Sequence, residues 1–329
     1  MPAPNASLTL SPLLPISLAR ISTGFTTASS LTHARIAHVA LDDSALGVHK
    51  VWKGARLTHS PAPSPPSQSA SGRADSVWQA TYPKGSLNPG NKTAPPGGAS
   101  FYLSGPPAFK KALQGAAARP EEVQEVVMAY EVMFEDGWDW VLGGKLPGMY
   151  GGSGDSAYGC SGGRQDDRCR CFNFRLMWRQ QGDLEVYAYT PPLPANLEVL
   201  LAVPPKSIEH SDYGVSVGRG AARFKAGKWH VVSERVKIGR VGRAEGELIE
   251  LYIDGKSVLC AKKLVLRTPE GHDGRVQGMH FSTFFGGNAP EWAPQKDQRA
   301  WFASITGAVL RPESSDEPDD DGVPARAEL

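Results

Sequence analysis

The fold that we expect is decided by two short stretches, Asn173-Phe174-Arg175-Leu176-Met177-Trp178 and, shortly after it, Tyr187-Ala188-Tyr189. Side chains two residues apart point to the same face of a β-strand. If both stretches are strands, Asn173 and Arg175 share a face, and so do Tyr187 and Tyr189. The residues that would point to the other face are apolar: Phe174, Leu176, Val186 and Ala188. This pattern predicts a sheet with one buried side and one functional side.

A glycine-rich stretch precedes these strands and carries one basic residue: Gly143-Gly144-Lys145-Leu146-Pro147-Gly148. Lys145 and Arg175 would bring two cations to the site, and Tyr187 and Tyr189 two phenol groups. Cations and hydrogen-bond donors of this kind suit an anionic substrate. No Ser-His-Asp arrangement and no His/Cys spacing typical of a metal site competes with them, so we expect neither a metal ion nor another cofactor.

Composition excludes several classes of partner. The chain has 329 residues, a formal net charge of +1 and a pI of about 7.7, so no overall field draws it to nucleic acid or to an anionic membrane. No apolar run approaches the ~20 residues of a membrane span. Its 36 glycines and 27 prolines, with little helical periodicity, favour an all-β protein with many turns.

The segments that we expect to be strands follow one another along most of the chain. They are 77–82, 99–103, 125–134, the two stretches quoted above, 213–217, 229–238, 247–253, 256–259, 276–285 and 301–310. Asp254-Gly255 lies between two of them and is a strong hairpin signal. One short helix is expected within 107–118. This series predicts a β-sandwich of the jelly-roll type, with a concave groove for an extended ligand.

The chain divides by composition into three parts. Residues 1–74 read as a largely irregular N-terminal extension that ends in a Pro/Ser-rich linker, although 31–57 has enough apolar residues for a strand pair. Residues 75–311 would form the jelly-roll domain. Residues 312–329 are acidic and polar and read as a disordered tail.

The four cysteines are Cys160, Cys169, Cys171 and Cys260, three of them in one polar loop. Zinc lacks a fourth nearby ligand, so a disulfide from Cys160 to Cys171 or to Cys169 is favoured over reduced thiols, and the sequence does not decide the pairing. A disulfide indicates an oxidising compartment. Together with two N-glycosylation triplets it favours secretion, although the N-terminus is a poor signal peptide.

Four motifs resemble polysaccharide lyase family 14, a family of β-jelly-roll lyases acting on polyuronates such as alginate and glucuronan. They are Phe134–Gly148, Gly159–Gly163, Phe174–Arg179 and Gly278–Gly287, and the resemblance covers roughly residues 77–310. It implies that the essential lysine of the family is Lys145, its essential arginine is Arg175 and its tyrosine pair is Tyr187 and Tyr189. One position departs from the pattern, because Asn173 stands where the studied enzymes of the family carry serine.

The chemistry of such a lyase agrees with these side chains. The enzyme removes the C5 proton of a uronate and expels the 4-O-linked sugar, and cations or hydrogen bonds on the carboxylate stabilise the charge that builds there. Arg175, Lys145 and Asn173 would bind the carboxylate. We expect the two cations to lower the pKa of a nearby tyrosine, so that Tyr187 or Tyr189 acts as the base and a phenol protonates the leaving oxygen.

Simpler roles stay open for each residue. Lys145 is otherwise a turn lysine, Arg175 a partner for an acid such as Glu185, and the tyrosines ordinary strand aromatics. His280 alternates with Ser282 and Phe284, so it is either a substrate ligand on the groove face or a hydrogen-bonded core histidine. The alternative to a lyase is a lectin-like jelly roll that holds acidic glycans without cleaving them. In both cases we expect a monomer whose partner is an acidic polysaccharide.

Overall fold

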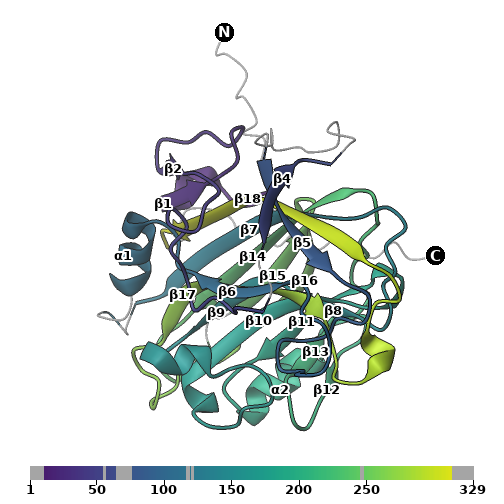
Figure 1. The fold of residues 1–329 in the computed structure, drawn as a ribbon. Coiled ribbons are helices and arrows are strands. Elements are labelled where there is room, and N and C mark those ends of the chain that lie inside the picture. Colours follow the sequence, from purple (N-terminus) through teal and green to yellow (C-terminus); the bar gives the residue numbers. More distant parts are fainter. Residues whose placement is uncertain are drawn as a thin grey trace, which may run out of the picture.

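Alternating side chains build two sheets in this protein. The computed structural model describes residues 11–54, 57–63, 76–115, 119, 122–244 and 248–312. Within these ranges each sheet has nine strands. Figure 1 shows the sheets layered on each other, with helix α1 (Pro107–Gly115) at the left edge and α2 (Pro194–Leu201) at the bottom.

The first sheet contains β18, the longest strand of the described residues. In spatial order it runs β16 (Lys256–Lys262), β15 (Leu248–Ile253), β14 (Trp229–Ile238), β7 (Gln124–Phe134), β18 (Gln298–Leu310), β1 (Ile21–Thr26) and β2 (Ile36–His38). Strand β5 (Ser76–Tyr82) pairs with β18 and with β4 (Thr58–Pro61). The expected hairpin at Asp254-Gly255 joins β15 to β16.

The second sheet carries the quoted stretches. Its order is β12 (Ile208–Glu209), β13 (Val215–Val217), β11 (Leu184–Tyr189), β10 (Cys171–Trp178), β8 (Gly144–Leu146), β17 (Arg275–Phe285), β6 (Ala99–Leu103) and β3 (Val48–His49). Strand β9 (Gly148–Gly152) pairs with β10 and β17. We call the side of this sheet that points away from the first sheet the site face.

The core lies between the sheets and confirms the predicted alternation. Phe174 and Leu176 of β10 and Val186 and Ala188 of β11 belong to one buried apolar cluster. The strands pair antiparallel, with Asn173 opposite Tyr189 and Arg175 opposite Tyr187. The all-β jelly-roll sandwich expected from the sequence is therefore confirmed.

The segment before residue 75 takes part in this architecture. Strands β1 to β4 are short and are separated by irregular chain, but β1, β2 and β4 belong to the first sheet and β3 to the second. Phe25 and Leu46 are fully buried in the main core. The division at residue 75 stays a prediction, and most of the Pro/Ser-rich linker and the tail 313–329 lie outside the described residues.

Candidate functional site

Lys145 reaches the site face because glycines let β8 fit between two longer strands. Lys145 lies opposite Met177 of β10 and Phe284 of β17. A Cβ atom on Gly144 would lie 2.1 Å from the Trp178 ring and 2.4 Å from the Phe284 carbonyl oxygen, so only glycine fits there. The Lys145 side chain is almost buried, at 9 % exposure, and its Nζ lies 3.5 Å from the centre of the Tyr187 ring.

Arg175 is held by a small polar network on the same face. Its Nε donates to Asn173 Oδ1 at 3.0 Å, and its Nη1 donates to Ser282 Oγ at 3.4 Å. Asn173 Nδ2 lies 3.1 Å from His280 Nδ1, and His280 stacks on the Tyr102 ring with centroids 4.1 Å apart. The histidine is thus a buried, hydrogen-bonded residue on the site face near the arginine, and its role as a substrate ligand stays a prediction.

Tyr187 and Tyr189 lie side by side, with ring centroids 5.7 Å apart. Tyr187 is half-buried and Tyr189 is buried. The Tyr189 ring packs against the polar loop before β10. The guanidinium carbon of Arg168, in this loop, lies 5.1 Å from the centre of the Tyr189 ring. A disulfide between Cys160 and Cys171 closes this loop, which decides the pairing that the sequence left open.

The six predicted residues therefore share one face. Four strands carry them. Strand β8 carries Lys145, β10 carries Asn173 and Arg175, and β11 carries Tyr187 and Tyr189. His280 comes from β17.

Burial sets the protonation states of the site. It lowers the pKa of Lys145 well below its usual value, and the nearby guanidinium groups of Arg175 and Arg179 lower it further. Burial, with Arg175 and Lys145 close by, also lowers the pKa of His280 well below its usual value. Both groups are therefore biased toward their neutral forms.

The tyrosines behave differently from our expectation. Burial raises the pKa of Tyr187 to about 12, and it also raises the pKa of Tyr189. Arg175, Arg168 and the backbone N–H groups of Gly163 and Gly162 pull the pKa of Tyr189 down, but burial outweighs them. The prediction that two cations make a phenolate here is wrong. The free-energy cost of removing the phenolate from water is larger than the stabilisation that nearby positive charges provide.

Glu185 does not neutralise Arg175. Its fully buried carboxylate binds Arg179 at 2.5 Å and Arg219 at 2.6 Å, and it accepts a hydrogen bond from Ser216. Arg175 has no acidic partner among the ion pairs of the described residues, which leaves its charge available to an anion.

Sequence reasoning missed several polar neighbours on this face. Ser100 Oγ lies 3.5 Å from His280 Nε2 and 3.4 Å from Ser282 Oγ. Tyr102 packs on His280 and on Tyr150. Ser100 and Tyr102 alternate in their strand, and this signal could have placed them on one face, but only the register of β6 with β17 brings them to His280.

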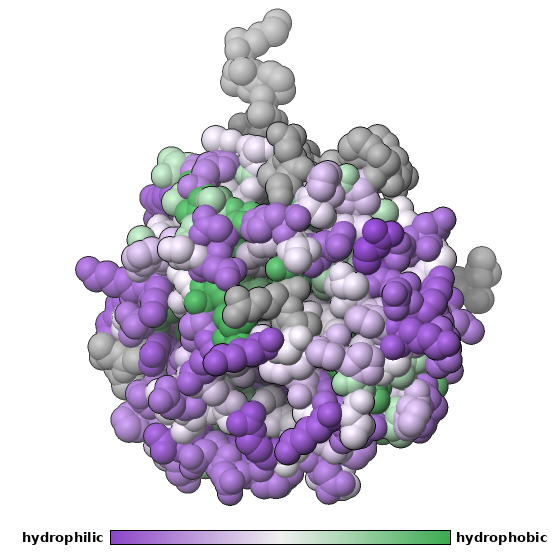
Figure 2. All heavy atoms as spheres, viewed as in Figure 1, coloured by the Kyte–Doolittle hydropathy of each residue, from purple (hydrophilic) through white to green (hydrophobic). Residues whose placement is uncertain are grey.

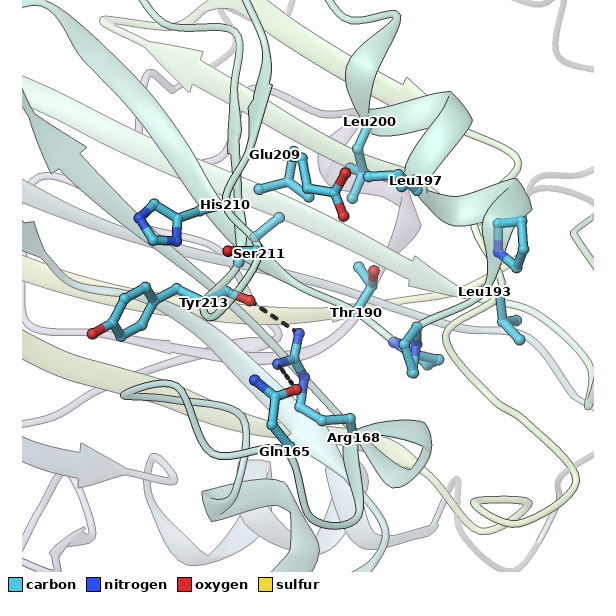
Figure 3. Close-up of a pocket in the computed structure, with 16 residues that line it drawn as sticks. Gln165, Arg168, Thr190, Leu193, Leu197, Leu200, Glu209, His210, Ser211 and Tyr213 are labelled. Atoms are coloured by element: carbon cyan, nitrogen blue, oxygen red, sulfur yellow. Dashed lines mark hydrogen bonds between the residues drawn. The ribbon is translucent and has the colours of Figure 1, made fainter.

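A hollow of about 300 Å³ lies beyond Tyr189, between the disulfide loop, the prolines after β11 and the β12–β13 turn. Figure 3 shows Arg168 on one side of it, bonded to Gln165 and to the Tyr213 carbonyl oxygen, with Glu209 and Leu197 across from it. Its floor is apolar and includes Ala188. It therefore borders the site, but neither Lys145 nor Arg175 lines it.

Two further features of the described residues bear on chemistry. They include no group of three or more His, Cys, Asp or Glu side chains placed to hold a metal ion. No helix in the described part of the chain has the length and apolar character that crossing a membrane requires.

Comparison with known proteins gives consistent matches. The family model described as polysaccharide lyase 14 matches residues 70–305. A marine alginate lyase from Aplysia kurodai is 29% identical over 88% of this chain and 99% of its own, with a TM-score of 0.62. The alginate lyase vAL-1 from Chlorella virus is 20% identical over 80% of this chain and 93% of its own, with a TM-score of 0.55, a likeness of fold. A search of curated proteins found no match.

Proposed function

Because this chain belongs to polysaccharide lyase family 14 and is a polysaccharide lyase, we propose that it cleaves alginate or a related polyuronate by β-elimination. The likeness to the Aplysia kurodai alginate lyase supports this substrate class. The observation that carries the proposal is the convergence of Lys145, Arg175, Tyr187 and Tyr189 on one face, where the arginine has no acidic partner among the described ion pairs.

The uronate carboxylate binds to Arg175 in this proposal. The guanidinium is planar and can grip a carboxylate with two parallel hydrogen bonds. Its Nε donates to Asn173 and its Nη1 to Ser282, which fixes the guanidinium on the site face, and the N–H groups that these contacts leave unused bind the carboxylate. As the C5 proton leaves, negative charge moves onto the carboxylate, and this buried cation stabilises it more than water would.

Lys145 is the base in this mechanism. An amine can accept a proton only when it is neutral, and burial favours the neutral form of Lys145. The Nζ atom takes the C5 proton, the C4–C5 double bond forms, and the bond from C4 to the leaving oxygen breaks. The new ammonium group then lies near the carboxylate, which stabilises its charge.

Tyr187 is the acid that protonates the leaving oxygen. A pKa of about 12 keeps its hydroxyl protonated at neutral pH, and the side chain is half-exposed and so within reach of the substrate. Its ring lies 3.5 Å from Lys145 Nζ, so the ammonium group formed on the lysine lies over the phenolate ring and stabilises it until exchange of protons with water restores both groups. Tyr189 is more deeply buried and positions Arg175 and the loop that closes the site.

The experiment that tests the function is incubation with polymannuronate, polyguluronate and polyglucuronate. New ultraviolet absorbance from the unsaturated uronate ends is expected with at least one of them. Binding of these polymers without new absorbance would make the chain a carbohydrate-binding jelly roll instead.

The disulfide supports secretion as the location. Disulfides such as Cys160–Cys171 form and persist mainly in oxidising compartments. We therefore place the enzyme outside the cell that makes it.

A further inference from the structure

A second basic cluster lies on the site face beyond Lys145, and we call it the arginine pocket. It is a hollow of about 270 Å³ lined by Leu142, Arg179, Gln180, Asp183, Arg219 and Trp292. Arg179 follows Met177 by two residues in extended chain, and Met177 is the strand partner of Lys145. The pocket therefore begins roughly 7 Å beyond Lys145 along the strand direction.

The pocket carries more positive than negative charge. Arg179 and Arg219 share one carboxylate, that of Glu185, and the pKa of this acid lies below its usual value because both guanidinium groups outweigh its burial. The other acid, Asp183, is paired with Arg223 at 2.8 Å. Three guanidinium groups thus face two carboxylates, which leaves one positive charge for a ligand.

Two side chains of the pocket have unused binding capacity. The Nε of Arg179 is buried and has no hydrogen-bond acceptor in the described part of the chain. The Arg219 side chain is 30% exposed, so part of its guanidinium is open to a ligand. A buried N–H group without an acceptor is costly, and a ligand oxygen would relieve it.

Trp292 gives the pocket a flat apolar wall. Its half-buried ring lies 5.8 Å from the Arg179 guanidinium carbon. The C–H face of a pyranose ring is apolar and packs on such a surface, while its carboxylate needs a cation at the edge. An aromatic ring beside two arginines meets both needs of a uronate residue.

We propose that the arginine pocket is a subsite that binds the carboxylate of a second uronate residue, further along the same polysaccharide from the residue held by Arg175. The subsite rests on the part of the proposed function in which Arg175 binds a polyuronate, and it adds a requirement for length. Only a chain that reaches from Arg175 to the pocket gains both contacts, so longer substrates are cleaved more efficiently than short ones.

Arg219→Gln is the variant that tests the subsite most sharply. It removes one partly exposed charge, while Glu185 keeps Arg179 and Ser216 as partners. The measurement is kcat/KM for alginate trimers and hexamers, followed by ultraviolet absorbance. The ratio of hexamer to trimer should fall about tenfold, as expected for the loss of one charge-assisted hydrogen bond. Trp292→Ala should lower the same ratio, and it replaces Arg219→Gln in the test if that variant does not fold.

The control is Arg243→Gln, which makes the same change of charge at an exposed position after β14, on the other sheet. Its ratio should match that of the unchanged enzyme. Two results would overturn the subsite: an unchanged ratio in the folded pocket variants, or an equal loss of kcat/KM for trimers and hexamers. Either would show that the arginines only support the β10–β11 hairpin.

A binding measurement separates this inference from the lyase proposal. With Lys145→Ala as the background, Arg219→Gln should weaken hexamer binding about tenfold in calorimetry. Unaltered binding overturns the subsite whether or not the enzyme turns over. Absence of product from every polyuronate, with tight binding that Arg219→Gln weakens, overturns the lyase proposal and supports the subsite.

Discussion

At the scale of single residues, the site is defined by an amine and a phenol held against each other. Lys145 Nζ lies over the Tyr187 ring, and burial moves the two pKa values in directions that favour a neutral amine and a protonated phenol. Environments that push two titrating groups apart in this way assign one as the base and the other as the acid.

The pH dependence of kcat/KM tests this assignment. The active form needs neutral Lys145, and its neutral fraction grows as pH rises through a pKa well below the usual lysine value. Tyr187 keeps its proton until pH approaches about 12. The value of kcat/KM should therefore increase as pH is raised and reach a plateau well before pH 10. A rate that keeps climbing toward pH 12 would point instead to a tyrosine phenolate as the base.

Separate replacement of the tyrosines distinguishes the acid from its neighbour. Tyr187→Phe removes the proton donor and should lower kcat by about 10²–10⁴-fold, the usual contribution of a general acid. Tyr189→Phe removes only a buried hydroxyl near Arg175 and should cost about tenfold, the effect of one hydrogen bond. Undiminished turnover of Tyr187→Phe would remove it from the mechanism.

The sequence predicted the chemistry of these residues better than their electrostatics. Alternation alone placed Arg175 with Asn173 and Tyr187 with Tyr189, because a strand has a fixed period of two. The glycine-rich stretch singled out Lys145, and the resemblance to a lyase family implied that this lysine is essential. The direction of the tyrosine pKa shifts could not be predicted, since it depends on how much water the folded chain removes around each phenol.

At the scale of elements, the loop from Cys160 to Cys171 supports the site from its end. The disulfide ties this loop to the first residue of β10, two residues before Asn173. The same loop carries Arg168, which lies over Tyr189. Loss of the covalent link would loosen both the loop and the contact with Tyr189.

Replacement of both Cys160 and Cys171 by Ser tests this support. The disulfide closes a short loop, so its removal should lower the free energy of unfolding by about 2–3 kcal/mol. Activity should fall in parallel with the loss of order around Tyr189. Cys169→Ser is the matched control, since that thiol is free and its replacement should change neither property. Equal behaviour of the two variants would contradict the role of the bridge.

Strands with clear alternation were predictable, and glycine-rich ones were not. The segments 99–103, 229–238 and 276–285 match β6, β14 and β17 within a residue. Strands β8 and β9 escaped because glycine has little preference for strands, and only the pairing with β10 and β17 forms them. Helix α2 also escaped, because it begins at the last of three closely spaced prolines that suggested a break in the chain.

At the scale of the whole molecule, the N-terminal segment is part of the core. Phe25 of β1 is fully buried and packs edge-on against Phe109 of α1, with centroids 4.9 Å apart. Strand β1 also pairs along β18 over most of its length. The sequence could not place this segment because its apolar residues meet partners that lie far along the chain.

Shortening the chain tests whether residues 75–311 fold alone. We expect a chain that lacks residues 1–74 to be insoluble or unfolded, because it exposes β18 and empties the space of Phe25. Phe25→Ala alone should cost about 3–5 kcal/mol of unfolding free energy. His38→Ala, at an exposed position of β2, should cost less than about 0.5 kcal/mol. A folded, stable 75–311 fragment in circular dichroism and thermal melting would establish the division at residue 75.

The surface predicts a monomer. Hydrophilic residues cover most of the face shown in Figure 2, with hydrophobic ones in small patches. Among the described residues the exposed large hydrophobic side chains are Val123, Leu201, Ile208 and Tyr213, and each is less than half exposed. Stable dimers usually need a larger apolar patch. Light scattering should give the mass of one chain at all concentrations, and a mass that grows with concentration would contradict this.

The burial of Arg175 has a consequence for activity in salt solution. Dissolved ions screen charges at the surface over about 8–10 Å, but they weaken buried charges much less. Arg175 is only 5% exposed. Added sodium chloride should therefore lower the rate at which a polymer associates with the enzyme. It should leave the contact between Arg175 and a bound carboxylate almost unchanged, so the enzyme should stay active at the salt concentration of seawater.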